Sequence, residues 1–486
     1  MRQIKSKTKL ATMDWTKFNQ RMVPYFLVSP DQRRLAAVMK EDDWNYVQVN
    51  DERQNVYELL FGMMFSPDSR RIAYFAMEES GKIITIVDDE NFGSYMMVMP
   101  ESLEFSPDSR QFAYTVKSHD GSCVVIDGEE QQTYKGILEY DTIFNPGREG
   151  YAYGAYDGEQ WHVITDQGRQ GPFEALGKLI FSPGGERLGY KARINGKEAL
   201  ILDGEQQKPY DHVDNPHFNR DGSFYAYAAR DGNQWVAVVN GVEQGRYDDL
   251  GLTDRSISDV GDHLVYCAKK AGQAYLVADG LELGPYPDVL MDSVTLSPDG
   301  NRLAFATKTG AKGFLGLLPK KEFHMIIDGE PGEVFNDLAL VLFSPDSSRY
   351  LYLAKRGGKE VLVIDGVVHG PFEGQIGIGE KSFSPDSSRV MYAIYAKNEL
   401  YICVDDQRFG PYKSADEFTF SPDGSHFAYP ALVEGRQSVV LDGEEGETFD
   451  NIVVLGGGKV VFDSAKEFHY IATQGMDWYR VEEVIT

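Results

Sequence analysis

The chain has 486 residues, of which 42% are hydrophobic and 25% charged, so it can bury a large core and is not a disordered polymer. The formal net charge of −27 disfavours a nucleic-acid partner, because an acidic body repels phosphate backbones. No stretch approaches the ~20 apolar residues of a membrane-spanning helix. Three dispersed cysteines (Cys123, Cys267 and Cys403) exclude a disulfide framework and disfavour a zinc site.

The chain opens with a basic segment, MRQIKSKTKLATMDW, that lacks the apolar stretch of a secretory signal peptide. We expect residues 1–13 to form a solvated basic tail. The expected location is the cytoplasm. The alternative is the periplasm, if a leader has been removed ahead of residue 1.

A Phe-Ser-Pro-Asp phrase recurs along the chain and divides it into repeats. The phrase starts at Phe65, Phe105, Phe343, Phe383 and Phe420, with weaker copies at Val28, Phe144, Phe181, Phe218, Ile257, Leu296 and Val461. These twelve anchors are 37 to 47 residues apart, and an aromatic residue stands nine positions after eleven of them. Such regular spacing predicts one supersecondary unit repeated twelve times.

Each repeat is predicted to form four strands. The anchor ends the first strand, and Ser-Pro-Asp forms a type I turn into an apolar second strand that ends in Ala-Tyr, as at residues 71–74. A third strand rich in Val and Ile leads to an Asp-Gly hairpin and a fourth strand. Gly-Pro-aromatic in several fourth strands, as at residues 171–173, suits an outer edge strand. The repeated Tyr and Asp are expected to serve packing and turns, not catalysis.

From about residue 15 to residue 486, the repeats resemble the TolB-type, WD40-like β-propeller repeats, which share the Phe-Ser-Pro-Asp-Gly turn. The resemblance implies an all-β propeller of twelve four-stranded repeats of about 39 residues. It also implies a binding platform, or a ring that gates substrate to a peptidase. The fold alone does not identify a function.

Known propellers have about 4–8 blades, so we expect two six-bladed rings, at residues 14–252 and 253–486. The eroded turn at residues 257–261 supports this boundary. One twelve-bladed ring is the alternative, because no linker separates the sixth and seventh repeats. The twelfth repeat lacks a fourth strand, and we expect Phe18–Leu27 to supply it and close a ring.

Loops between the second and third strands, and between repeats, vary in length and are the expected binding face. The eighth repeat has a ten-residue insertion there, whose candidate partner-binding residues are Lys308, Lys312, Phe314, Leu317, Lys320 and Lys321. A basic, apolar loop on an acidic body is a plausible docking element. A tolerated surface insertion is the equally weighted alternative.

Two further sets of residues fall on the same face. Trp161, Trp235 and Trp478 each stand seventeen residues after their anchors, where they would form a recognition patch or pack between blades. His212, Asp214 and His217 have a spacing that a divalent metal could use. Turn-forming composition is the favoured interpretation of that loop, so we expect no metal and no cofactor.

The sequence contains no nucleophile elbow, phosphate loop, dinucleotide fingerprint or zinc-protease helix. The leading hypothesis is therefore a non-catalytic scaffold that binds a protein or peptide, with a basic partner favoured by the acidic charge. The alternative is an enzyme or lectin that acts on a glycan or peptide in a central funnel. His212, Asp214 and His217 would be the first candidates for its site.

Overall fold

The computed structural model describes residues 2–21, 24–138, 144–253, 255–258, 261–308 and 322–486. Within these ranges the regular structure is β-strand, with no α-helix and with three 3₁₀ turns, η1 (Trp15–Lys17), η2 (Pro100–Ser102) and η3 (Glu380–Ser382). None of the described segments forms a helix that could cross a membrane.

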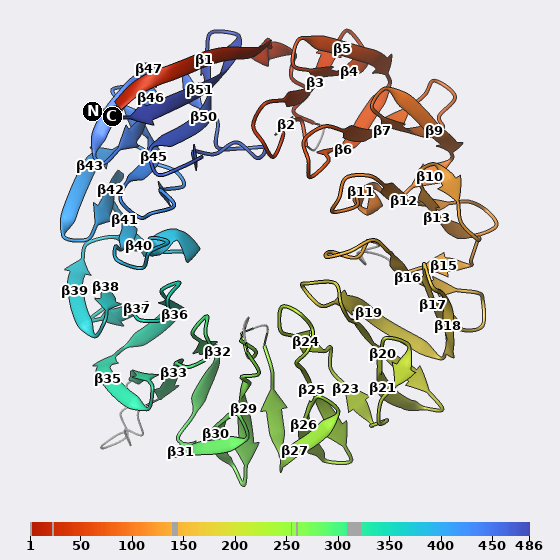
Figure 1. The fold of residues 1–486 in the computed structure, drawn as a ribbon, viewed down its shortest axis with the longest axis vertical. Coiled ribbons are helices and arrows are strands. Elements are labelled where there is room, and N and C mark those ends of the chain that lie inside the picture. Colours follow the sequence, from red (N-terminus) through yellow and green to blue (C-terminus); the bar gives the residue numbers. More distant parts are fainter. Residues whose placement is uncertain (1, 22–23, 139–143, 254, 259–260, 309–321) are drawn as a thin grey trace. The chain divides into compact units, whose positions relative to one another are not determined.

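The strands form twelve small antiparallel sheets, numbered here as blades 1 to 12 in chain order. This confirms the expected all-β propeller architecture of twelve four-stranded repeats. In blades 3, 6 and 12 the first strand is split into two pieces that both pair with the second strand. The contacts divide the chain into two compact units, Met1–Pro172 with Ser414–Thr486, and Phe173–Lys413. The first unit holds blades 11, 12 and 1 to 4, and the second unit holds blades 5 to 10. Figure 1 shows the blades within each unit side by side.

The blades of the first unit are blade 1, β2 (Phe26–Val28), β3 (Leu35–Glu41), β4 (Trp44–Val49) and β5 (Glu52–Tyr57); blade 2, β6 (Leu59–Phe65), β7 (Ile72–Met77), β8 (Ile83–Val87) and β9 (Glu90–Tyr95); blade 3, β10 (Met97–Val98), β11 (Glu104–Phe105), β12 (Phe112–Lys117), β13 (Ser122–Ile126) and β14 (Glu129–Glu130); blade 4, β15 (Gly136–Ile137), β16 (Ala152–Tyr156), β17 (Trp161–Thr165) and β18 (Gly168–Phe173); blade 11, β44 (Thr419–Phe420), β45 (Phe427–Val433), β46 (Arg436–Leu441) and β47 (Glu444–Phe449); and blade 12, β48 (Asn451–Ile452), β49 (Val461–Phe462), β50 (Glu467–Gln474), β51 (Asp477–Ile485) and β1 (Arg2–Thr12).

The blades of the second unit are blade 5, β19 (Ala175–Phe181), β20 (Leu188–Ile194), β21 (Lys197–Leu202) and β22 (Glu205–Gln206); blade 6, β23 (His212–Val213), β24 (His217–Phe218), β25 (Tyr225–Asp231), β26 (Gln234–Val239) and β27 (Val242–Tyr247); blade 7, β28 (Asp249–Gly251), β29 (Val265–Lys270), β30 (Gln273–Ala278) and β31 (Leu281–Tyr286); blade 8, β32 (Val289–Leu296), β33 (Leu303–Lys308), β34 (Phe323–Ile327) and β35 (Glu330–Phe335); blade 9, β36 (Asp337–Phe343), β37 (Tyr350–Arg356), β38 (Lys359–Ile364) and β39 (Val367–Phe372); and blade 10, β40 (Gln375–Gly377), β41 (Met391–Ala396), β42 (Glu399–Val404) and β43 (Gln407–Tyr412).

The core lies between blades, where the apolar faces of successive sheets meet. The repeated Tyr sits there as expected: Tyr74, Tyr114 and Tyr227 are at most 1% exposed. The hairpins follow the Asp-Gly prediction, since Asp127 and Gly128 have φ of 50° and 82°, the left-handed values of a type I′ turn. The Gly-Pro-aromatic segments lie in fourth strands, as the edge-strand argument requires.

The expected grouping into two rings, residues 14–252 and 253–486, is wrong. Two separate rings would place blade 1 against blade 6 and blade 7 against blade 12. Instead, Phe26 and Leu35 of blade 1 share a core with Trp478 of blade 12. Blades 6 and 7 likewise share a core that continues across residue 252, from Ala226 to Tyr266. The eroded turn of the seventh repeat therefore marks no boundary.

The closing strand is β1, and the expected assignment of Phe18–Leu27 to this role is wrong. β1 pairs antiparallel with β51 over the whole strand, from Arg2 opposite Ile485 to Thr12 opposite Asp477. Phe18 instead packs in the core between blades 12 and 1. Residues 1–13 were expected to be a solvated tail, but as far as they are described they lie mainly in this strand.

Charge explains why such a polar segment forms a strand. Lys5 contacts Glu467 at 2.9 Å, Lys7 contacts Glu447 at 2.8 Å and Lys9 contacts Asp477 at 2.8 Å, so the cations of β1 meet carboxylates of blades 11 and 12. An outer strand with this pairing needs no alternation of apolar residues, because its backbone bonds and ion pairs attach it to the sheet.

The loop between the first and second strands, called here the first turn, links each blade to the next. The sixth residue after the anchor is commonly an arginine, and in at least four blades its guanidinium crosses to the following first turn. Arg71 Nε donates to Asp88 of its own hairpin at 2.9 Å, and Arg71 Nη1 donates to the Arg110 carbonyl of blade 3 at 2.9 Å. We call this contact the interblade clip. Arg34, Arg302 and Arg349 make the same contact.

The ion pairs of β1 predict a measurable contribution to stability. Lys7→Glu would place two carboxylates together at Glu447, and it would remove a cation that lies 4.7 Å from the Phe449 ring centroid. We expect a loss of about 1 kcal/mol in the free energy of unfolding, measured by urea titration. The double variant Lys7→Glu with Glu447→Lys should recover part of this loss. Equal stability of the single variant and the native chain would contradict an electrostatic role.

The interblade clip predicts that replacing Arg71 lowers the free energy of unfolding more than replacing its neighbour Arg70. Arg71→Gln would lose the bonds to Asp88 and to the blade 3 carbonyl, and we expect it to lower the free energy of unfolding by about 1–2 kcal/mol. Arg70→Gln is the matched control, because Arg70 is exposed and its contact with Asp68 is 3.9 Å long. Its change should stay below about 0.5 kcal/mol. Similar urea midpoints for the two variants would refute the clip as a stabilising contact.

Candidate functional site

The boundary between blades 3 and 4 departs from the clip pattern. Gln111 occupies the sixth position after the Phe105 anchor, where the clip arginine stands in blades 1, 2, 8 and 9. Its side-chain amide donates to Asp127 of its own blade at 3.0 Å. In blade 4 the fourth position is Arg148, whereas the clipped turns of blades 2, 3, 9 and 10 have a serine there. The serine matters because Asp68 N donates to Ser109 Oγ at 3.0 Å across the preceding boundary.

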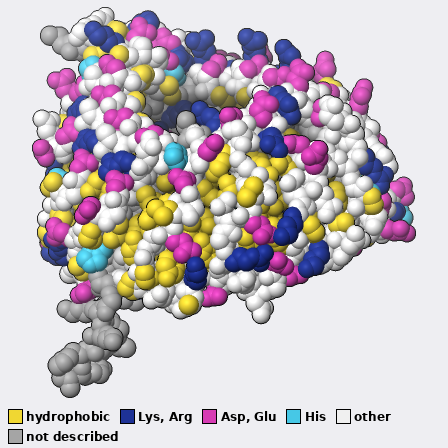
Figure 2. All heavy atoms as spheres, turned by 60° about the horizontal axis from the view of Figure 1, so that its bottom comes forward, with side chains coloured by type: hydrophobic (Ala, Val, Ile, Leu, Met, Phe, Trp, Pro, Cys, Tyr) yellow, Lys and Arg dark blue, Asp and Glu magenta, His cyan; other side chains and the backbone are white. Residues whose placement is uncertain are grey.

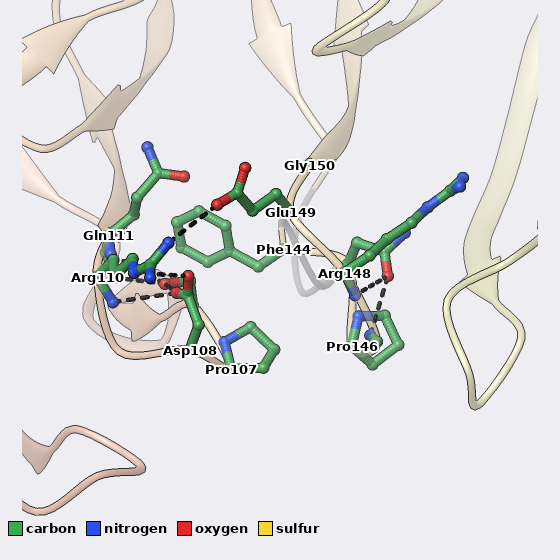
Figure 3. Close-up of a pocket in the computed structure, with 12 residues that line it drawn as sticks. Pro107, Asp108, Arg110, Gln111, Phe144, Pro146, Arg148, Glu149 and Gly150 are labelled. Carbon is green, nitrogen blue, oxygen red and sulfur yellow. Dashed lines mark hydrogen bonds and ion pairs between the residues drawn. The ribbon is translucent and has the colours of Figure 1, made fainter.

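A pocket of about 500 Å³ opens between these two first turns, and we call it the seam pocket. Figure 3 shows Pro107 and Pro146 on opposite sides of the gap, with Phe144 between the turns. The pocket is lined by Ser106, Pro107, Asp108, Arg110, Gln111, Phe144, Asn145, Pro146, Gly147, Arg148, Glu149 and Gly150. All of these belong to the first unit.

Local hydrogen bonds hold both walls of the pocket. Ser106 Oγ accepts from Gln111 N at 2.9 Å and donates to Asp108 Oδ1 at 2.6 Å. The second bond lowers the pKa of Asp108, and the backbone N–H of Arg110 lowers it further, so Asp108 is a carboxylate at neutral pH. In the opposite wall, Asn145 Oδ1 accepts from Gly147 N at 3.0 Å.

One ion pair crosses the mouth of the pocket. Arg110 Nη1 contacts Glu149 Oε1 at 3.2 Å, and the two side chains are 75% and 81% exposed. An ion pair this exposed contributes at most about 1 kcal/mol, so water or a ligand can replace it. The pocket therefore has a displaceable charged rim, while the Phe144 side chain behind it is buried, at 2% exposed.

The pocket lining consists mainly of charged, amide and turn-forming residues. The lining has one hydroxyl side chain, that of Ser106, which donates to Asp108, and no lining residue is a histidine or a cysteine. Nucleophilic catalysis needs a nucleophile beside a proton acceptor that can activate it, and a carboxylate of depressed pKa is a poor base. Carboxylates, guanidinium groups and an aromatic ring are instead common recognition elements.

The candidate residues of the insertion in blade 8 are mostly outside the described part of the chain. Lys308 ends β33 and contacts Asp288. Lys312, Phe314, Leu317, Lys320 and Lys321 lie outside the described residues, so the insertion stays a prediction.

The three candidate tryptophans have different surroundings. Trp478 is 1% exposed, and its ring stacks on Trp15 at 4.6 Å, so it belongs to the core and not to a recognition surface. Trp161 is partly buried beside Tyr156, with ring centroids 5.2 Å apart. Trp235 is partly buried and meets the His212 ring edge-on at 5.8 Å. A binding role for Trp161 and Trp235 remains a prediction.

The weak metal candidates are only partly brought together. His212 Nε2 lies 3.0 Å from Asp214 Oδ1, and His212 Nδ1 lies 2.9 Å from Glu198 Oε2, so carboxylates engage both ring nitrogens. His217 lies in a separate strand, β24. Among the described residues no group of three or more His, Cys, Asp or Glu side chains could hold a metal ion.

Apolar side chains also gather on the surface of the second unit (Figure 2). Val242, Leu281 and Val367 begin fourth strands and are 60–65% exposed. Protein surfaces ordinarily expose single apolar side chains, so the seam pocket is the stronger candidate.

Sequence reasoning missed the seam pocket because it assigned the first turns to structure alone. The signal was present in the repeat: Gln111 replaces the usual arginine, and residues 145–150 depart from the Ser-Pro-Asp pattern. This signal can be interpreted once it is known that the sixth residue after the anchor contacts the next blade.

No protein-family model matches this sequence, and no curated protein does either. Among solved structures the chain is similar to a eukaryotic initiation factor, at 14% identity and a TM-score of 0.34 over 70% of this chain and 96% of that one. It is also similar to the Dos1 propeller, at 13% identity and a TM-score of 0.27 over 62% and 90% of the two chains. A third similar structure is the β-propeller domain of the Trilobed protease from Pyrococcus furiosus, at 14% identity and a TM-score of 0.27 over 57% and 95%.

Proposed function

We propose that the protein is a non-catalytic β-propeller scaffold that binds a peptide segment of a protein partner in the seam pocket. The observation that carries the proposal is the pocket itself, which opens where Gln111 replaces a clip arginine. Its volume of about 500 Å³ falls in the range of small-ligand sites. The lining has recognition groups and lacks a nucleophile with its base.

The rigidity of the walls supports this function. Binding costs less when the receptor is already ordered, because fewer side chains and loops lose freedom on association. Asn145 fixes one turn and Ser106 fixes the other through short hydrogen bonds to backbone N–H groups. The hydrophobic core between blades 3 and 4, which includes Phe144 and Tyr153, packs the two blades against each other.

We further infer that the blades belong to the TolB-type, WD40-like class, on the strength of their Phe-Ser-Pro-Asp turns. The variable loop face remains a second proposed surface, with Trp161 and Trp235 as its aromatic residues. The net charge of −27 favours a basic partner on either surface.

A pocket-filling substitution tests the function without assuming what the ligand is. Gln111→Trp should fill the seam pocket and abolish capture of the partner from an extract of the native source. Gln407→Trp, at an exposed glutamine that begins β43, is the matched control and should capture the partner as the native chain does. Melting temperatures within about 3 °C of the native chain would show that both variants are folded. Identical partners for native chain and Gln111→Trp would refute binding in this pocket.

A further inference from the structure

The fifth residue after the anchor separates one group of blades from the rest. It is a cation in four successive blades of the first unit: Lys466 in blade 12, Arg33 in blade 1, Arg70 in blade 2 and Arg110 in blade 3. We call these four residues the basic row. In the other blades the position holds a neutral or acidic residue: Glu149, Glu186, Ser223, Asp262, Asn301, Ser348, Ser388 or Ser425.

The first turn does not need a cation at this position. A clip arginine bonds to the backbone carbonyl of the fifth residue and not to its side chain. Arg71 Nη1 donates to the Arg110 carbonyl at 2.9 Å, and Arg349 Nη1 donates to the Ser388 carbonyl at 2.8 Å. Because serine receives the clip as well as arginine does, the clip does not explain the basic side chains.

The clips hold members of the row next to each other. Arg34 bonds to the Arg70 carbonyl between blades 1 and 2, and Arg71 bonds to the Arg110 carbonyl between blades 2 and 3. Blade 12 shares a hydrophobic core with blade 1. Charges on turns that touch repel one another, because screening at physiological ionic strength acts over about 8 Å. The row therefore has an electrostatic cost that the fold does not require.

The side chains of the row are open to solvent and weakly paired. The side chains of Arg70 and Arg110 are 86% and 75% exposed, and the other two members are exposed as well. Arg70 Nε lies 3.9 Å from Asp68, and Arg110 lies 3.6 Å from Asp108 and 3.2 Å from Glu149. Ion pairs this exposed are weak, so carboxylates from another molecule can replace them.

We propose that the basic row is a docking surface for an acidic segment of a partner polypeptide. Carboxylates of the segment pair with the exposed cations, and arginine suits this role because its planar guanidinium can hold a carboxylate through two parallel hydrogen bonds. Binding also removes the repulsion within the row. The inference goes beyond the proposed function, which concerns the seam pocket, although Arg110 belongs to both surfaces.

The surroundings of the row favour a polypeptide over a phosphate backbone. Asp31, Asp68 and Asp108 stand two residues before the row members of their turns and would repel a continuous line of phosphates, as would the net charge of −27. A peptide can place its carboxylates at the cations alone. The net charge acts on the approach of a partner and favours one that is basic as a whole, whereas the row acts at contact.

The test uses the full chain and two labelled peptides of about twelve residues, one alternating glutamate with serine and the other glutamine with serine. Fluorescence anisotropy should show that the glutamate peptide binds at least about tenfold more tightly. Its affinity should fall when sodium chloride is raised from about 50 mM to about 300 mM, because salt screens exposed charges.

Two matched double variants locate the binding. Arg33→Ser with Arg70→Ser gives blades 1 and 2 the serine of blades 9 to 11, and it should weaken binding of the glutamate peptide by about tenfold. Arg53→Ser with Lys82→Ser removes the same charge from exposed positions outside the first turns, and it should change the affinity by less than about twofold. Melting temperatures within about 3 °C of the native chain would show that both variants are folded.

Equal binding of the two peptides, or equal losses in the two double variants, would overturn the proposal. An oligothymidylate that binds as tightly as the glutamate peptide through Arg33 and Arg70 would also overturn it, because the row would then suit a phosphate backbone. If the proposal falls while Gln111→Trp still abolishes capture of the partner, the proposed function stands. If the row binds the glutamate peptide while Gln111→Trp captures the partner normally, the row stands and the seam pocket falls.

Discussion

A guanidinium that bonds to the backbone of the next blade is the contact on which the arrangement of the first turns depends. Apolar packing between sheets is broad and tolerates small shifts, whereas Arg71 meets both a hairpin carboxylate and a neighbouring carbonyl at 2.9 Å. Hydrogen bonds made by a charged group are stronger than neutral ones and have directional requirements. The clips therefore fix the separation of successive first turns, so a change at one boundary leaves a defined pocket and not a loose loop.

Contacts between cationic side chains and carboxylates also attach β1 to the closing blade. β1 has few apolar side chains, and its lysines meet Glu467, Glu447 and Asp477. At the end of the strand, Arg2 is largely buried and lies 3.4 Å from Glu483, which also accepts from Tyr470 at 2.8 Å. In a chain with a large excess of carboxylates, a basic strand has its complement on the blades it joins.

Much of this fold could be predicted from the sequence, because each repeat has strong local signals. The anchor phrase, the buried Tyr and the Asp-Gly hairpins all occupy the predicted places, since turn chemistry and period-two burial are local properties. β1 could not be recognised in the same way, because its alternating lysines follow from partners that lie at the far end of the sequence. The position of Phe18–Leu27 ahead of the first anchor suggested a closing strand, but Phe18 instead packs against Trp478.

The grouping of blades and the seam pocket depend on contacts between repeats. Repeat length hardly changes across residue 252, and the eroded turn at residues 257–261 lies within one repeat, so neither feature reports which blades are in contact. The sequence shows Gln111 at a position where several other repeats have arginine. This difference can be interpreted once the structure shows that the arginine bonds to the next blade. Position-by-position comparison of repeats, weighted toward residues that reach a neighbour, would have found this site.

The pairing of β1 with β51 has a consequence for how the molecule is made. Lys5 and Glu467 are 462 residues apart, so β1 is synthesised long before the strands it pairs with and contacts. Contacts of such large sequence separation form late, because the intervening chain must be ordered first. Until β51 has been synthesised, the basic β1 segment lacks the strand that it pairs with. Trp478 of β51 is 1% exposed in the completed blade 12. A nascent chain that stops before β51 therefore leaves blade 12 unfinished and β1 unpaired.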